Sequence, residues 1–177
     1  MNEAAVAGED RSPTPGLGRR LASFLYEGVL LFGVVMIAGY LFSSLTQQRH
    51  ALYLREAGMA FLFVVLGIYF AWFWSHGGQT VAMKTWHLRV VTREGAALSQ
   101  VRALARYVAV WLWFLPPLAL VGVVGVNELG GGGSFAVVAS YVLAYAALSF
   151  ILPQRQFVHD ALCGTRLVTF RPPVKRG

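Results

Sequence analysis

The sequence predicts an all-α integral membrane protein with about four transmembrane helices and a small cytoplasmic β-ribbon. Charged residues make up 13% of its 177 residues, and hydrophobic residues make up 56%. A soluble domain usually carries about 25% charged residues, so this chain holds too few to cover a water-facing surface. The charges are also segregated, because four long stretches have almost none and the basic residues gather between alternate stretches. The length suits one domain.

The first predicted helix covers residues 20–45. Arg19 and Arg20 stand at its start, and Gly28–Leu45 is a run of 18 uncharged residues. This run is longer than the apolar core of a secretory signal, and no clear small-residue cleavage site follows it. We therefore expect the helix to remain in the mature protein. Residues 1–15 are largely polar and contain two prolines, which predicts a disordered cytoplasmic tail.

Three further spans are predicted at residues 57–76, 101–126 and 134–153. The second span contains no Asp, Glu, Lys or Arg, and it ends near Trp72 and Trp74, where an aromatic belt meets the membrane surface. In the third span, Pro116 and Pro117 are expected to kink the helix. The glycine-rich residues 127–134 are expected to form a flexible turn before the fourth span.

The distribution of Lys and Arg predicts the orientation of the helices. Thirteen of these 15 residues lie in the N-terminal segment, the loop between the second and third spans, and the C-terminal segment. The other two lie in the first loop. Cytoplasmic loops are enriched in Lys and Arg, so both termini and the second loop are predicted to be cytoplasmic. We expect one transmembrane domain over residues 16–171 and a basic C-terminal tail over residues 172–177.

Two short segments are predicted to pair as a β-ribbon at the cytoplasmic face. Residues 87–92 and 165–170 are rich in β-branched residues, and the first segment alternates between apolar and polar side chains. Both segments lie on the same side of the membrane in the predicted topology, so they can meet. Residues 98–106 are expected to form an amphipathic lead-in to the third span.

Glu27 is the candidate functional residue that most needs an explanation, because it is the one acidic side chain within the first span. A charge at the centre of a bilayer costs about 2.5–3.5 kcal/mol on insertion scales. Arg20 precedes Glu27 by seven residues, and seven residues turn a helix by about 700°, so both side chains share one face about 10 Å apart along the axis. Asp160 follows the fourth span at the level of Arg20, and we expect an Arg20–Asp160 ion pair beside His159.

Two interpretations of these polar residues stay open. In the first, Arg20, Glu27 and Asp160, supported by Arg106, form a partly buried lock that holds the first helix against the fourth, since polar groups often fasten membrane helices together. In the second, Glu27 is a protonatable carboxylate that binds an ion. His159 is a supporting residue in both interpretations.

The order of these residues resembles the RDD family of bacterial membrane proteins. That family is named for an Arg at the start of the first transmembrane helix, an Asp inside that helix and a second Asp. The stretch Gly18–Glu27 is similar to its opening, with Arg20 on the family Arg and Glu27 on the first Asp. Asp160 falls on the second Asp. Glu27 keeps the charge of the family residue but reaches one methylene further.

Two further stretches carry the resemblance. Gly78–Lys84 together with Leu88–Val91 is similar to the middle motif of the family, and His159–Val168 is similar to its closing motif. The resemblance covers nearly the whole chain. It implies a bacterial inner-membrane protein that transports a cation or proton, or a small solute, and it implies no enzyme activity, cofactor or metal.

An accessory role is the alternative function. In that role the protein transports nothing and binds a partner through its cytoplasmic face, presenting residues 87–92 and 165–170. Expected partners are the lipid bilayer and either a second copy of the chain or another membrane protein. Nucleic acid is not expected, because no basic, aromatic-rich surface segment is present. The single cysteine, Cys163, excludes an internal disulfide, and no Cys/His spacing resembles a zinc site.

Overall fold

The computed structural model describes residues 13–46 and 54–171, and this part of the chain contains four long apolar helical segments. They are α2 (Leu17–Leu45), α3 (Arg55–Ser75), the α5–α6 segment (Gln100–Val124) and α7 (Val126–Leu148). Each has at least 21 residues, and about 20 apolar residues span a bilayer. The predicted membrane fold is therefore confirmed. Residues 1–12 and 172–177 of the two predicted tails lie outside the described residues.

The first spanning helix buries polar side chains and exposes apolar ones. On α2, the buried residues include Arg20, Ser23 and Glu27, whereas Leu25 and Phe32 are largely exposed. This pattern is the reverse of a helix in a soluble protein. It suits a bilayer, because lipid tails cover the apolar side chains while the helix satisfies its own backbone hydrogen bonds.

The third span is broken near its middle. It consists of α5 (Gln100–Val110), one turn of 3-10 helix, η1 (Trp111–Trp113), and α6 (Leu115–Val124). Pro116 and Pro117 follow the break, in the first turn of α6. Proline lacks an N–H and its ring clashes with the preceding turn, so the regular α-helix cannot run through this point. The kink predicted from the two prolines is confirmed.

The flexible turn predicted over residues 127–134 is confirmed only in part. The chain leaves helical geometry at Gly125, with φ 95° and ψ 135°, and again at Gly130, with φ 67° and ψ 170°, which lies inside the predicted turn. The residues between and after these two breaks are helical. Glycine has a low intrinsic helix propensity, but helical geometry at the membrane satisfies backbone groups internally. Helix α7 ends at Leu148, before the predicted residue 153.

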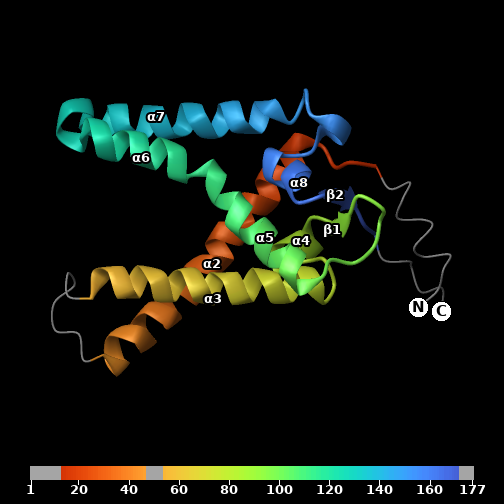
Figure 1. The fold of residues 1–177 in the computed structure, drawn as a ribbon, viewed down its shortest axis with the longest axis horizontal. Helices are drawn as coiled ribbons and strands as arrows, with labels where there is room; N and C mark the ends of the chain where they lie inside the picture. Colours follow the sequence, from red (N-terminus) through yellow and green to blue (C-terminus); the bar gives the residue numbers. More distant parts are fainter. Residues whose placement is uncertain (1–12, 47–53, 172–177) are drawn as a thin grey trace.

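The remaining elements gather at one end of the molecule, as Figure 1 shows. They are α4 (Val81–Thr85), β1 (Leu88–Thr92), η2 (Pro153–Arg155), α8 (Val158–Leu162) and β2 (Thr165–Thr169). β1 and β2 pair in antiparallel fashion, with Leu88 opposite Thr169 and Val90 opposite Leu167. The predicted β-ribbon is therefore confirmed. We call the part of the molecule formed by these five elements the ribbon end.

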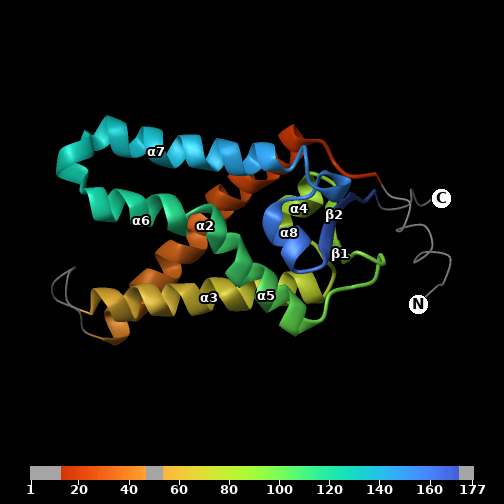
Figure 2. The same cartoon turned by 45° about the horizontal axis from the view of Figure 1, so that its top comes forward.

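The buried core of the helices lies near the ribbon end. α5 packs along α3, whereas α6 packs mainly on α7. In both cartoon views the α6–α7 hairpin stands apart from α3, and α2 crosses between them (Figures 1 and 2). The core of buried side chains includes Trp74, Leu88, Tyr107, Trp113 and Phe157, so it lies where α3 and α5 reach the ribbon.

Candidate functional site

Asp160 is the centre of a fully buried ion pair. The Nε of Arg106, on α5, donates to Asp160 Oδ1 at 2.7 Å. The hydroxyl of Thr165, on β2, donates to the same oxygen at 3.0 Å. The side chain of Asp160 has no exposed surface, and that of Arg106 is 5% exposed. These contacts fasten α8 to both α5 and β2.

His159 completes this cluster as a neutral residue. Burial lowers the pKa of His159 to about 4, although Asp160 acts in the opposite direction. The backbone N–H of His159 donates to the Tyr145 oxygen, so the Tyr145 hydroxyl is left to donate to Nδ1, at 3.1 Å. This pattern assigns the ring proton to Nε2, which lies 3.6 Å from Asp160 Oδ2.

Asp160 stays ionised in spite of its burial. Burial by itself raises the pKa of Asp160, but the charge of Arg106 and the hydrogen bonds from Arg106 and Thr165 outweigh it, so the pKa lies below its ordinary value. His159 is neutral near pH 7, so its contact with Asp160 adds no ion pair there. The cluster therefore holds one positive and one negative charge.

The predicted ion pair between Arg20 and Asp160 is wrong. Arg20 Nη1 donates to the Arg155 carbonyl at 2.8 Å, and Nη2 donates to Ser149 Oγ at 3.4 Å. Among the described residues, the ion-pair partner of Asp160 is Arg106. Arg106 is the partner of Asp160 because α5 packs against α8. Its predicted role was only supporting, although a cation next to an apolar span needs an anionic partner.

Glu27 belongs to a second, separate cluster. The Tyr69 hydroxyl, on α3, donates to Glu27 Oε1 at 2.7 Å. The Thr80 hydroxyl donates to Glu27 Oε2. Thr80 Oγ1 also accepts the Met83 N–H at 3.2 Å and so caps α4. Glu27 therefore joins α2 to α3 and α4. Arg20 and Glu27 are both buried on α2, as their spacing predicts, but they reach different partners.

Tyr69 and Thr80 were missed from the sequence. One signal for Thr80 was present, since a Thr just before a short helix commonly accepts an N–H of its first turn. Gly78 holds the segment before Thr80 in position, because the Val90 N–H of β1 donates to the Gly78 carbonyl at 2.7 Å. With φ +70° and a Cβ position 2.5 Å from the Val90 carbonyl, Gly78 leaves no room for a larger residue.

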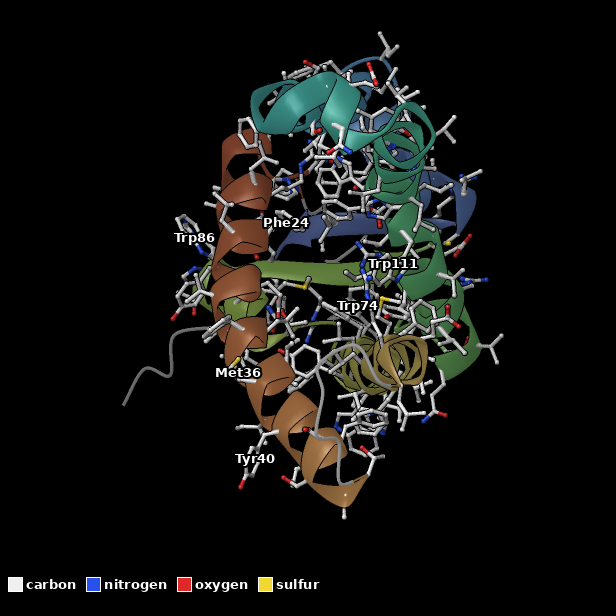
Figure 3. All side chains as sticks on the ribbon, turned by 90° about the vertical axis from the view of Figure 1, so that its left-hand side faces the viewer. Phe24, Met36, Tyr40, Trp74, Trp86 and Trp111 are labelled. Atoms are coloured by element: carbon white, nitrogen blue, oxygen red, sulfur yellow. The ribbon has the colours of Figure 1, made fainter. Side chains whose placement is uncertain are left out.

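A cavity of about 320 Å³ lies between α2, α3 and the α5–α6 segment. Its polar lining comes from both clusters and from α2: Arg20, Ser23, Glu27, Thr80, Arg106 and His159. Asp160 is not among the lining residues. The rest is mainly apolar and aromatic, and Figure 3 shows Phe24, Trp74 and Trp111 within the frame of these helices. The cavity is thus an apolar chamber with a few charged groups.

Stacking on aromatic rings orients the two arginines of the cavity. The Arg106 guanidinium lies 4.2 Å from the centre of the Trp74 ring, and that of Arg20 lies 4.3 Å from the Phe157 ring. Such contacts favour a cation over an aromatic face. Within residues 13–46 and 54–171, no group of three His, Cys, Asp or Glu side chains could hold a metal ion.

The sequence profile of the RDD family matches residues 14–164 of the chain. No protein of curated function matches the chain, and no solved structure matches it. The match covers most of the chain and includes Arg20, Glu27 and Asp160, which are the residues that carried the resemblance. The chain belongs to the RDD family.

Proposed function

We propose that this RDD protein carries a small solute across the bilayer and that Glu27 takes up and releases a proton in each cycle. The observation that supports this role is the position of Glu27, which is 7% exposed, lies within a membrane span and lines the cavity. Among the described residues, no Lys, Arg or His lies within ion-pair distance of it.

The partners of Glu27 can serve both of its protonation states. A hydroxyl group is both a donor and an acceptor, whereas a protonated carboxyl has one donor of its own. Tyr69 and Thr80 can therefore donate to the carboxylate, and one of them can turn to accept from the carboxylic acid. An arginine partner would favour only the charged state. The Glu27 cluster thus permits a change of charge that the Asp160 cluster resists.

Exchange of a bare cation is less well supported than movement of another solute. Arg20 lines the cavity together with Glu27 and has no ion-pair partner among the described residues, and its positive charge disfavours a cation in the same space. The proposed role involves no enzymatic step.

We also infer that the ribbon end faces the cytoplasm of a bacterium, because the loops rich in Lys and Arg meet there. An impermeant maleimide should therefore label Glu94→Cys from the cytoplasmic side, and labelling from the other side would reverse the orientation.

The alternative is an accessory protein that binds a partner through the same face. One observation favours a partner within the membrane: the α6–α7 hairpin stands apart from α3 (Figure 2). Its exposed apolar side chains, which include Val123, Phe135 and Leu143, face lipid or such a partner. Presentation of the ribbon strands is less well supported, because Leu88 and Val168 are each only 1% exposed. Recovery of a stoichiometric second protein after crosslinking in native membranes would favour this alternative.

Proton movement in proteoliposomes tests the proposal. A dye that reports pH is sealed inside, and gradients of Na⁺, K⁺ or octanesulfonate are imposed in turn. We expect at least one gradient to move protons in the wild type, and we expect Glu27→Gln to abolish that movement. Glu128→Gln is the matched control, because Glu128 is an exposed carboxylate on α7.

Two results would overturn the proposal. One is a folded wild type that moves no protons under any of the three gradients. The other is movement that persists unchanged in Glu27→Gln. In either case the Glu27 cluster is a structural fastening of α2 to α3 and α4, and the accessory role takes precedence.

A further inference from the structure

We propose that the cavity takes an amphipathic anion, with its charged head on Arg20 and its apolar body among the aromatic walls. This inference rests on the proposed function, because it names the chemical class of the solute. It is carried by the surroundings of one buried arginine and by the composition of the cavity lining.

Arg20 is a buried cation without an anionic contact. Its residue is 4% exposed, and it lines the cavity. Its hydrogen-bond acceptors are two neutral oxygens, the Arg155 carbonyl and Ser149 Oγ, and its Nε has no hydrogen-bond partner among the described residues. No carboxylate of the described chain lies within ion-pair distance of it; Asp160 acts on it only at longer range and is already paired with Arg106. Buried charges are normally paired, because an unpaired one is costly, so a ligand can supply the missing anion.

The charges around the cavity leave room for one anion. Arg20 and Arg106 contribute two positive charges, and Asp160 contributes one negative charge that Arg106 already neutralises. When Glu27 carries a proton, a single positive charge remains, which a monovalent anion balances. Binding of the anion and protonation of Glu27 therefore favour each other, as coupled movement of an anion and a proton requires.

The groups that bear on Glu27 come from every element around it. Tyr69 of α3 and Thr80 before α4 contact it directly. Arg20 lies on the same helix, about 10 Å along its axis, and Arg106 and His159 line the same cavity from α5 and α8. None of these groups is a carboxylate. Asp160 acts on Arg20 from beyond ion-pair distance, and the adjacent Arg106 balances its charge.

The walls of the cavity select an apolar body. Phe24, Phe70, Trp111 and Phe114 lie along it, and Phe24 contacts Phe114 with ring centres 6.0 Å apart. Ligand sites of about 300–1,000 Å³ that are mainly apolar with a few polar groups are typical for small organic molecules. The volume of about 320 Å³ suits a short-chain amphiphile. The same chemistry could come from a free organic acid or from an anionic lipid whose acyl chain enters the cavity.

Quenching of tryptophan fluorescence measures this binding directly, because Trp74, Trp111 and Trp113 line the cavity. The probe is 8-bromooctanoate, whose bromine quenches tryptophan only on close approach, and the neutral control is 8-bromooctanol. For the full-length protein in detergent we expect saturable quenching, with the acid binding at least about tenfold more tightly than the alcohol. Arg20→Gln should remove that preference, whereas Arg20→Lys should keep it within a few-fold. Arg19→Gln is the matched control, because Arg19 lies next to Arg20 but does not line the cavity.

The two sources of the anion are separated in nanodiscs that contain acyl-brominated phosphatidylglycerol or phosphatidylcholine. Stronger quenching by phosphatidylglycerol that disappears in Arg20→Gln assigns the cavity to a lipid, and quenching by the free acid alone assigns it to a soluble amphiphile. Either result supports the proposal.

Equal affinity for acid and alcohol in the wild type, or an acid preference that survives in Arg20→Gln, would overturn the proposal. If Arg20→Gln does not fold, the affinity for the acid relative to the alcohol, measured in the wild type and in Arg20→Lys, tests the proposal instead. The quenching assay uses no gradient. Absence of acid-selective binding would therefore not contradict proton movement in proteoliposomes, and absence of proton movement would not contradict acid-selective binding.

Discussion

The two buried carboxylates among the described residues, Asp160 and Glu27, have partners of different charge. Asp160 contacts Arg106 and lies outside the cavity lining, whereas Glu27 contacts two hydroxyl groups and lines the cavity. An ion pair holds a carboxylate in one protonation state, so the Asp160 cluster is suited to fastening the ribbon end. Hydroxyl partners tolerate a change of charge, so the Glu27 cluster is suited to a working role. One family pattern thus contains a structural acid and a candidate functional acid.

The largest effect on stability is expected from Asp160→Asn. It leaves Arg106 as a buried cation without its partner, and breaking a buried ion pair in this way costs about 3–5 kcal/mol of unfolding free energy. Unfolding in mixed micelles measures it. Glu27→Gln should cost less, because it leaves no buried cation unpaired. An equal loss in both variants would remove the difference between the two clusters.

A smaller effect is expected from pH, and it should arise at the Asp160 cluster through His159. The pKa of His159 falls from its ordinary value of 6.5 to about 4 in the folded protein. The unfolded chain therefore binds a proton first as the pH falls, so stability is lost between pH 6.5 and pH 4 by up to about 1.4 kcal/mol per pH unit. The pKa of Asp160 is also lowered, so its own loss should begin only near and below its ordinary value of 3.8.

Unfolding of the wild type and of His159→Gln at pH 7 and pH 5 separates this contribution from other groups. We expect His159→Gln to reduce the loss of stability over this interval. His76→Gln is the matched control, because His76 is exposed and lies at the end of α3. A loss of the same size in His159→Gln and the wild type would mean that His159 is not the responsible group.

The smallest effect on stability is expected from Thr80→Val, which tests the Glu27 cluster. Valine keeps the shape of threonine but removes both the donor to Glu27 and the acceptor for the Met83 N–H. Loss of such a cap costs about 1–2 kcal/mol. Thr85→Val, at an exposed position of α4, should change unfolding free energy by less than about 0.5 kcal/mol. If Glu27 works as proposed, Thr80→Val should also slow proton movement, whereas Thr85→Val should not.

Much of the fold could be predicted from the sequence because its causes are local. A bilayer requires long uncharged helices, so the four spans follow from composition alone. The β-ribbon followed from alternation over short segments, and the kink followed from Pro116 and Pro117. The turn expected at residues 127–134 is narrower than predicted, with breaks at Gly125 and Gly130, because glycine content does not determine which glycine leaves the helix, and backbone hydrogen bonding at the membrane keeps the other residues helical.

The sequence by itself determined which groups had to be buried with partners, because Arg20, Glu27 and Asp160 lie in or beside spans where an unpaired charge is costly. Only the tertiary structure decided which partner each one has. Arg106 reaches Asp160 because α5 packs against α8, and Tyr69 and Thr80 reach Glu27 because α3 and α4 lie beside α2. Helical periodicity places residues on a face of one helix, whereas a contact between helices depends on how the helices cross. The cavity belongs to the second kind, since its lining comes from elements far apart in the chain.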